Sequence, residues 1–160
     1  LFGTISEENC SQIVHSLHVM DCENNDPITF IINSQGGCPE QALAVASTIR
    51  ILDSEVNTHA VGSCMSAAPW ILAAGTGTRT ASKTCIFMTH FGEWEIGDKG
   101  KDQLEAWMDY RDIMNEVWFK SIAEWTGGLE VFWQKLSKDK DHYFNAMTAL
   151  EYRLIDKVTE

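Results

Sequence analysis

Residues 27–52 read PITFIINSQGGCPEQALAVASTIRIL, a stretch that carries the clearest signal of fold class. Its first part, Pro27 to Ile32, is a nearly continuous apolar run with β-branched residues, which is typical of a buried parallel strand. Ser34-Gln35-Gly36-Gly37 then interrupts the run. Pro39 suits the first position of a helix, and apolar side chains follow at helical spacing: Ala42, Val45, Ala46, Ile49 and Leu52. A buried strand, a glycine turn and a helix form the repeating unit of α/β folds.

The alternation of strands and helices continues on both sides of this stretch. Further strands are predicted over Leu1 to Ile5, Val56 to Val61, Arg79 to Ala81 and Thr84 to Thr89, with a tight connection at Gly62 to Met65. Helices are predicted from Ser6 to Met20, from Ser66 to Ala74 and from Lys101 to Trp125, followed by a shorter helix and a last helix-strand pair. The prediction is an α/β fold with mostly parallel strands, in one domain over residues 1–160.

Composition narrows the classes of function. The chain has 160 residues, 12 Lys and Arg against 23 Asp and Glu, and a net charge of -11. Nucleic acid and anionic membrane surfaces need a basic face, so neither is an expected partner. No apolar run reaches the roughly 18 residues of a membrane helix. The five cysteines form no C-x-x-C pair and the histidines no H-E-x-x-H motif, so we expect reduced thiols, no metal, no cofactor and a cytoplasmic protein.

Two glycine-containing junctions follow predicted strands, at the sheet edge where open α/β folds bind ligands. The first, Asn33 to Gly37, can turn backbone N–H groups toward a ligand because glycines permit close approach. The second, Gly62-Ser63-Cys64-Met65-Ser66-Ala67-Ala68, presents a serine where a strand turns into a helix. Helix N-terminal amides there would stabilise an oxyanion. Each junction is also compatible with a plain turn or an N-cap, and Cys64 is a rival nucleophile.

A serine nucleophile needs a base, and the base needs an orienting acid. His90 is the best candidate base because it directly follows the strand predicted over Thr84 to Thr89. Asp141, at the end of a charged run, is the candidate acid. Taken singly, each of these residues is compatible with an ordinary structural role.

Four motifs occur in an order that resembles a known family. They are Asn33-Ser34-Gln35-Gly36-Gly37, Gly62-x-x-x-Ser66, Met88-Thr89-His90 and Asp141-x-x-x-x-Ala146, followed by Ala149-x-Glu151-Tyr152-x-Leu154-Ile155-Asp156. Together they resemble ClpP, the proteolytic subunit of the Clp protease, from Leu1 to Val158. The resemblance implies a ClpP/crotonase-like spiral of parallel strands with helices. The family's N-terminal axial segment has no counterpart in these residues.

The resemblance also implies roles for individual residues. Ser66 would be the nucleophile, His90 the general base and acid, and Asp141 the orienting carboxylate. The oxyanion would be held by the backbone amides of Gly37 and Ala67. The substrate would lie extended beside residues that the resemblance assigns to the groove: Gly36, Cys38, Pro39, Phe91, Gly92, Glu93 and Trp94.

The family resemblance extends to assembly. Residues from about 91 to 126 match the strand-helix handle that joins two heptameric rings, and the helix expected over Lys101 to Trp125 carries an apolar stripe. A homo-oligomer of two stacked rings is therefore expected, fed with unfolded polypeptide by an AAA+ unfoldase that hydrolyses the ATP. The chain departs from the family at Gln35, at Phe91-Gly92, and in the unfoldase-binding rim, where Thr29, Ile31 and Ile51 replace aromatic residues.

Three alternatives stay open. The chain could be a ClpP-like ring subunit without activity, although it keeps all three triad residues. It could be a crotonase-type acyl-CoA enzyme, which shares the spiral core and a two-amide oxyanion hole. A membrane-associated signal-peptide-peptidase relative with a serine-lysine dyad is the third, and the lack of a membrane segment counts against it.

Overall fold

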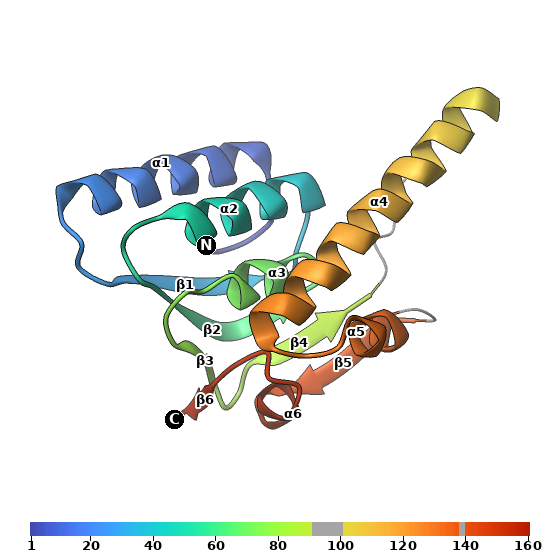
Figure 1. Ribbon diagram of the computed structural model, residues 1–160. Helices are drawn as coiled ribbons and strands as arrows, with labels where there is room; N and C mark the ends of the chain where they lie inside the picture. Colours follow the sequence, from blue (N-terminus) through green and yellow to red (C-terminus); the bar gives the residue numbers. More distant parts are fainter. Residues whose placement is uncertain (91–100, 138–139) are drawn as a thin grey trace.

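The computed structural model describes residues 1–90, 101–137 and 140–160 (Figure 1). The helices are α1 (Glu7–Glu23), α2 (Pro39–Ile51), α3 (Ala68–Ala73), α4 (Lys101–Thr126), α5 (Glu130–Ser137) and α6 (Ala146–Glu151). The strands are β1 (Ile28–Ser34), β2 (Val56–Met65), β3 (Arg79–Ser82), β4 (Ile86–Thr89), β5 (His142–Asn145) and β6 (Lys157–Thr159). The predicted α/β class with mostly parallel strands is confirmed.

The sheet is organised around β2, which is longer than its neighbours. On one edge β2 pairs in parallel with β1 over most of the length of β1. The other edge is shared: Thr58 to Ala60 pair with β3, and Ser63 to Met65 pair with β4. Strand β6 extends the sheet beyond β3 in parallel, and β5 extends it beyond β4 in the antiparallel sense. The sheet therefore divides into two wings that diverge from β2.

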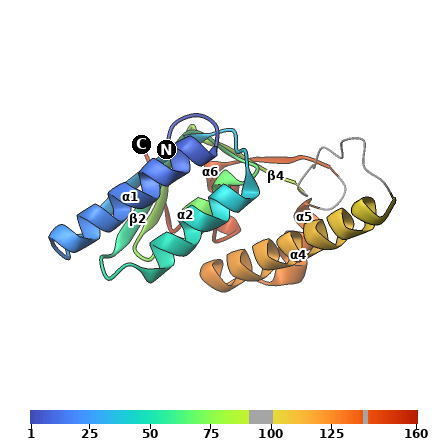
Figure 2. The same cartoon turned by 90° about the horizontal axis from the view of Figure 1, so that it is seen from above.

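Helices α1 and α2 lie side by side over one face of the sheet, with α3 beneath α2 (Figures 1 and 2). Local sequence explains where both outer helices begin. The Ser6 side chain caps α1 by accepting a hydrogen bond from the Asn9 amide at 3.4 Å. Pro39 occupies the first turn of α2, where its missing N–H costs no hydrogen bond. The core between these helices and the sheet is fully buried at its largest aliphatic positions: Ile5, Ile32, Ile49, Ile71 and Leu72.

Three predicted boundaries are wrong. Leu1 to Ile5 is not a strand, because only Phe2 and Ile5 form isolated bridges. Residues Gly62 to Met65 are not a turn, because β2 continues through them and pairs with β4. Helix α3 begins at Ala68 rather than at Ser66, which leaves Ser66 between strand and helix. The strand part of the expected handle falls on residues 91–100, outside the described residues.

The apolar stripe predicted on the long helix has two parts. Met114, Trp118 and Ile122 are buried in the core. Met108 and Val117 of the predicted stripe are exposed, and Ile113, which lies outside the stripe, is exposed too. In Figures 1 and 2 the first half of α4, drawn in yellow, projects away from the sheet. The buried side chains thus lie in the C-terminal half of α4, and an exposed apolar face runs from Met108 to Val117.

An ion pair joins the end of the chain to the sheet and to α4. The Arg79 guanidinium, about nine-tenths buried, donates to Asp156 Oδ1 at 2.7 Å and to the Trp125 carbonyl at 3.0 Å. The Arg79 amide also donates to Asp156 Oδ2 at 2.8 Å. Burial tends to raise the pKa of Asp156, but the hydrogen bonds and charge of Arg79 outweigh it, so that this pKa lies below its ordinary value of 3.8.

We expect Asp156→Asn to lower the free energy of unfolding at pH 7 by about 1–3 kcal/mol, because it leaves the buried Arg79 charge without its counter-ion. A carboxylate with a lowered folded-state pKa stabilises above its unfolded pKa and loses that contribution as pH falls. The deficit of the variant should therefore narrow between pH 5 and pH 2.5 in urea titrations. Asp26→Asn, at an exposed position, is the control. A deficit that stays constant with pH would contradict this account.

Candidate active site

The strand register brings three residues from distant parts of the chain to one place. Met65 of β2 pairs with Met88 of β4, so the residue after β2, Ser66, lies beside the end of β4. The Ser66 amide donates to the Met88 carbonyl at 2.9 Å. Thr89 pairs with His142 of the antiparallel β5, so the next residues outward, His90 and Asp141, face each other.

These side chains form a hydrogen-bonded row. Ser66 Oγ lies 2.7 Å from His90 Nε2, and His90 Nδ1 lies 3.2 Å from Asp141 Oδ1. In the tautomer with its proton on Nδ1, His90 donates to Asp141 and accepts from Ser66. The His90 side chain is 18% exposed and that of Asp141 44% exposed. The row therefore opens to solvent at its acid end, and the serine-histidine pair is more enclosed.

Ser66 has an unusual backbone conformation. Its φ is +57°, in the left-handed region that non-glycine residues rarely adopt. Strained conformations of this kind concentrate at functional sites, and a serine on a sharp strand-to-helix turn presents its hydroxyl outward. The continuous β2 and the late start of α3 create this turn.

The first glycine junction packs directly against Ser66. A Cβ on Gly36, whose φ is +100°, would lie 2.5 Å from the Ser66 Cβ. A Cβ on Gly37 would lie 2.3 Å from the Ile5 carbonyl oxygen. Both positions therefore require glycine. Among the described residues, nothing accepts a hydrogen bond from the amides of Gly37 or Ala67.

A side-chain network ties the two junctions together. The Asn33 side-chain oxygen accepts from the Ser63 amide at 3.1 Å and from the Ser63 hydroxyl at 3.2 Å. Gln35 Nε2 in turn donates to Ser63 Oγ at 2.9 Å. Asn33 and Gln35 belong to the first junction and Ser63 to the second. The network holds the glycine loop and the Ser66 turn in a fixed relation, and it gives the departure at Gln35 a structural use.

The rival nucleophile Cys64 is poorly placed for chemistry. Its side chain is fully buried within β2, and burial, followed by the neighbouring Cys85, raises the pKa of its thiol well above the ordinary value. A thiol needs to ionise and to reach the substrate in order to attack. The geometry therefore favours Ser66 over Cys64.

Tyr143 is a member of the site that sequence reasoning missed. Its hydroxyl donates to Asp141 Oδ2 at 3.2 Å, the carboxylate oxygen not used by His90. This hydrogen bond and the Asp141 charge raise the pKa of Tyr143. The sequence signal is the spacing of Asp141 and Tyr143, because side chains two residues apart on an extended segment point to the same side. That segment was not predicted to be a strand.

The expected substrate groove is described only in part. Gly36 is buried beside Ser66, and Cys38 and Pro39 are half-buried where α2 begins. Phe91, Gly92, Glu93 and Trp94 lie outside the described residues, so their role stays a prediction.

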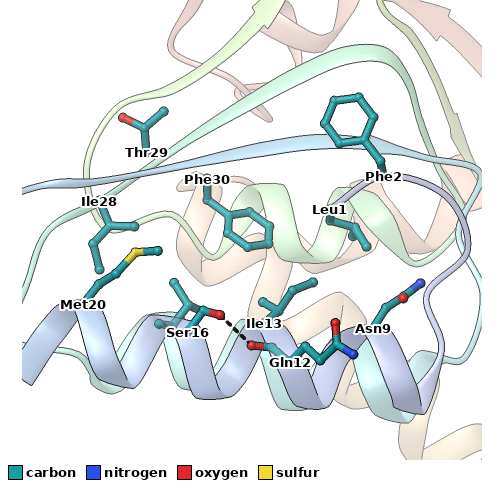
Figure 3. A pocket seen from close by; sticks show the side chains of 11 residues that line it. Leu1, Phe2, Asn9, Gln12, Ile13, Ser16, Met20, Ile28, Thr29 and Phe30 are labelled. Carbon is teal, nitrogen blue, oxygen red and sulfur yellow. Dashed lines mark hydrogen bonds between the residues drawn. The ribbon is translucent and has the colours of Figure 1, made fainter.

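A separate pocket of about 330 Å³ lies between α1 and β1 (Figure 3). Its wall is largely apolar, with side chains such as Leu1, Ile13 and Phe30 directed into it. Thr29, one of the three rim positions, lines this pocket, while Ile31 and Ile51 of the same set are 43% and 73% exposed. None of the residues of the Ser66 row lines this pocket.

Within residues 1–90, 101–137 and 140–160, no three His, Cys, Asp or Glu side chains are grouped so as to hold a metal ion. No helix in those ranges is both long and apolar enough to span a membrane.

Comparisons with known proteins agree with one another. The family model described as Clp protease matches residues 1–160. The chain is 32% identical over 165 residues to ATP-dependent Clp protease proteolytic subunit 3 of Synechococcus sp. (strain CC9605), covering 99% of this chain and 80% of that relative. It is 29% identical over 161 residues to the ATP-dependent Clp protease proteolytic subunit of Carsonella ruddii, covering 99% and 81%.

A solved structure is similar over the whole chain. It is that of a mutant of ClpP1 from Listeria monocytogenes, with a TM-score of 0.87, 26% identity, and coverage of 100% of this chain and 89% of that one. The fold, the order of the motifs and the match over residues 1–160 lead to one conclusion: this chain belongs to the Clp protease family, as a divergent ClpP.

Proposed function

We propose that this chain is a serine endopeptidase subunit of a Clp-type protease and cleaves unfolded polypeptides with a Ser66-His90-Asp141 triad. The observation that carries the proposal is the 2.7 Å contact between Ser66 Oγ and His90 Nε2, backed by Asp141 on the other ring nitrogen. Family membership supports the reaction class, since the named relatives are ATP-dependent protease subunits.

In the first half-reaction Ser66 Oγ attacks the carbonyl carbon of a peptide bond while His90 Nε2 accepts its proton. Asp141 stabilises the imidazolium that forms, and Tyr143 helps to hold the Asp141 carboxylate through its second oxygen. The tetrahedral oxyanion would accept hydrogen bonds from the amides of Gly37 and Ala67. Each such donor contributes about 2.7–4 kcal/mol to transition-state stability in comparable sites.

The first half-reaction ends when His90 gives its proton to the leaving amine, which departs and leaves an acyl-enzyme on Ser66. Water then attacks the ester with His90 as base, and the carboxylic acid product leaves Ser66 with its proton restored. An extended substrate beside Gly36, Cys38, Pro39 and residues 91–94 would be held mainly by its backbone. Selectivity for sequence should therefore be low.

Assembly is part of the same proposal. The exposed Met108, Ile113 and Val117 of α4 give the handle an apolar face suited to another copy of the chain, as in two stacked heptameric rings. Ile31 and Ile51 and the pocket beside β1 are the apolar features that would meet an AAA+ unfoldase. A cytoplasmic location fits free thiols at all five cysteines.

The alternatives predict different chemistry. A crotonase-type enzyme would bind coenzyme A and has no use for an activated serine. A silent ring subunit would assemble without turnover. The Ser66 turn supports the peptidase, because strained backbone concentrates at functional sites and this turn presents the hydroxyl outward.

Treatment with a fluorophosphonate should add one adduct per chain to the assembled protein, because His90 activates Ser66 toward phosphorus electrophiles. Intact mass measures the adduct, and Ser66→Ala is the control that should stay unmodified. If the parent protein is folded and assembled but stays unmodified, the peptidase proposal is contradicted and the catalytically silent ring subunit is supported.

Gly37→Ala should lower kcat for a fluorogenic peptide by about 10²-fold or more, because the new methyl group displaces an oxyanion amide. Gly3→Ala is the matched control: Gly3 also has a positive φ of +91°, but its Cβ would meet nothing within 4 Å. The control should lose some stability and keep its kcat. Equal kcat values in the two variants would show that the Gly37 amide does not act as an oxyanion donor.

Ile113→Glu should separate the stacked rings, because it places a charge in the apolar face of α4, where Ile113 is 57% exposed. Native mass spectrometry should show the mass of the assembly roughly halved. Ile51→Glu, on a different exposed apolar site, should keep the parent mass. A parent mass in both variants would exclude this face as the ring contact.

A further inference from the structure

The glycine loop beside Ser66 is linked to the long helix by a side chain with no assigned role. Glu40, in the first turn of α2, accepts a hydrogen bond from the Tyr110 hydroxyl of α4 on Oε1 at 2.7 Å. Its other oxygen, Oε2, accepts from the Cys38 thiol at 3.0 Å. One half-buried carboxylate thus joins α4 to the residue that follows Gly37.

Cys38 transmits this contact to the loop. Its amide donates to the Ile5 carbonyl at 2.9 Å, and the Ile5 amide donates to the Gly36 carbonyl at 2.8 Å. Its own side chain does not cap α2, so the thiol is free to point at Glu40. The path from Tyr110 through Glu40 and Cys38 therefore ends at the peptide units on either side of Gly37.

The place of Tyr110 on α4 makes the contact informative. The C-terminal part of the helix is anchored by Trp70, which donates to Ser121 Oγ at 2.7 Å, and by Arg50, which lies 5.8 Å from the centre of the Trp125 ring. Tyr110 lies about three turns before Ser121. Tyr110 belongs to the first half of α4, which projects away from the sheet (Figure 2). The hydrogen bond to Glu40 therefore depends on the position of the first half of α4 relative to α2.

The protonation states are those that the contact needs. Burial and then Glu40 raise the pKa of Tyr110 to about 12, so its hydroxyl keeps the proton it donates. Burial acts to raise the pKa of Glu40, but hydrogen bonds from Cys38 and Tyr110 outweigh it and lower the pKa. Burial, followed by the hydrogen bond to Glu40, raises the pKa of Cys38, which makes its thiol a donor rather than a nucleophile.

We propose that Glu40 is a positioning residue that holds the Gly36–Cys38 loop in place through Tyr110 of α4. The role rests on the proposed peptidase function, because Gly37 supplies an oxyanion donor there. Glu40 touches neither the triad nor the substrate, and it acts on turnover through the orientation of the Gly37 amide.

Four variants test the role in the full-length assembled protein: Glu40→Ala, Glu40→Gln, Tyr110→Phe, and the double variant Glu40→Ala with Tyr110→Phe. Hydrogen exchange of peptides spanning residues 36–42, read by mass spectrometry, reports loop order without any need for activity. A loosened loop should exchange about threefold to tenfold faster at Cys38 in Glu40→Ala and in Tyr110→Phe. Asp109→Asn, an exposed carboxylate beside Tyr110, is the control and should exchange like the parent.

Kinetics with a short fluorogenic peptide give the second readout. We expect kcat to fall about threefold to tenfold in Glu40→Ala with KM little changed, because an oxyanion donor acts in the transition state. Glu40→Gln keeps an oxygen acceptor and should recover part of the loss. The double variant should match Glu40→Ala alone, because Tyr110 acts through Glu40.

The outcomes separate the two claims. A parent that neither hydrolyses peptide nor takes up fluorophosphonate defeats the proposed function, and hydrogen exchange alone then decides whether Glu40 orders the loop. An active parent whose variants keep parental exchange and kcat overturns the role of Glu40 and leaves the peptidase intact. Additive losses in the double variant would also overturn it, since Tyr110 would then act by another route.

Discussion

The site depends on how β2 divides one edge between two partners. Its first half pairs with β3 and its last residues with β4, so the sheet splits where Ser66 follows. The split separates β4 and β5 from β3. His90 and Asp141 come close to Ser66 because β4 runs parallel to β2 and β5 antiparallel to β4. A shift of one residue in either register would turn one of the side chains away.

The aromatic residues behind the site oppose such a shift. Phe87 of β4 stacks on Phe144 of β5 with ring centres 5.4 Å apart, and the register pairs these two residues directly. Tyr152 lies against Phe144 and Phe132 on the same side. Large rings that fit in one arrangement cost more to displace than small side chains. The packing beneath β4 and β5 therefore supports the register that places His90 beside Asp141.

Sequence patterns predicted much of this arrangement. The apolar run from Pro27 and the helix begun by Pro39 lie where expected, because strong local signals and burial agree there. The extension of β2 past Gly62 was missed, since a glycine normally marks a turn. The Asn33 side chain fills the space a Gly62 Cβ would need, and the φ of Gly62 is +62°, so this position in the strand requires glycine. The conformation of Ser66 and the contact from Tyr143 depend on tertiary pairing, which no local pattern encodes.

The left-handed backbone of Ser66 also affects how an inactive substrate trap should be built. Alanine removes the hydroxyl but keeps a Cβ, and in this region of φ a Cβ is crowded by the following carbonyl oxygen at a cost of about 1–2 kcal/mol. Glycine removes the hydroxyl and the crowding together. Ser66→Gly therefore relieves this crowding whereas Ser66→Ala keeps it, so under the proposed peptidase function glycine gives the less strained inactive form.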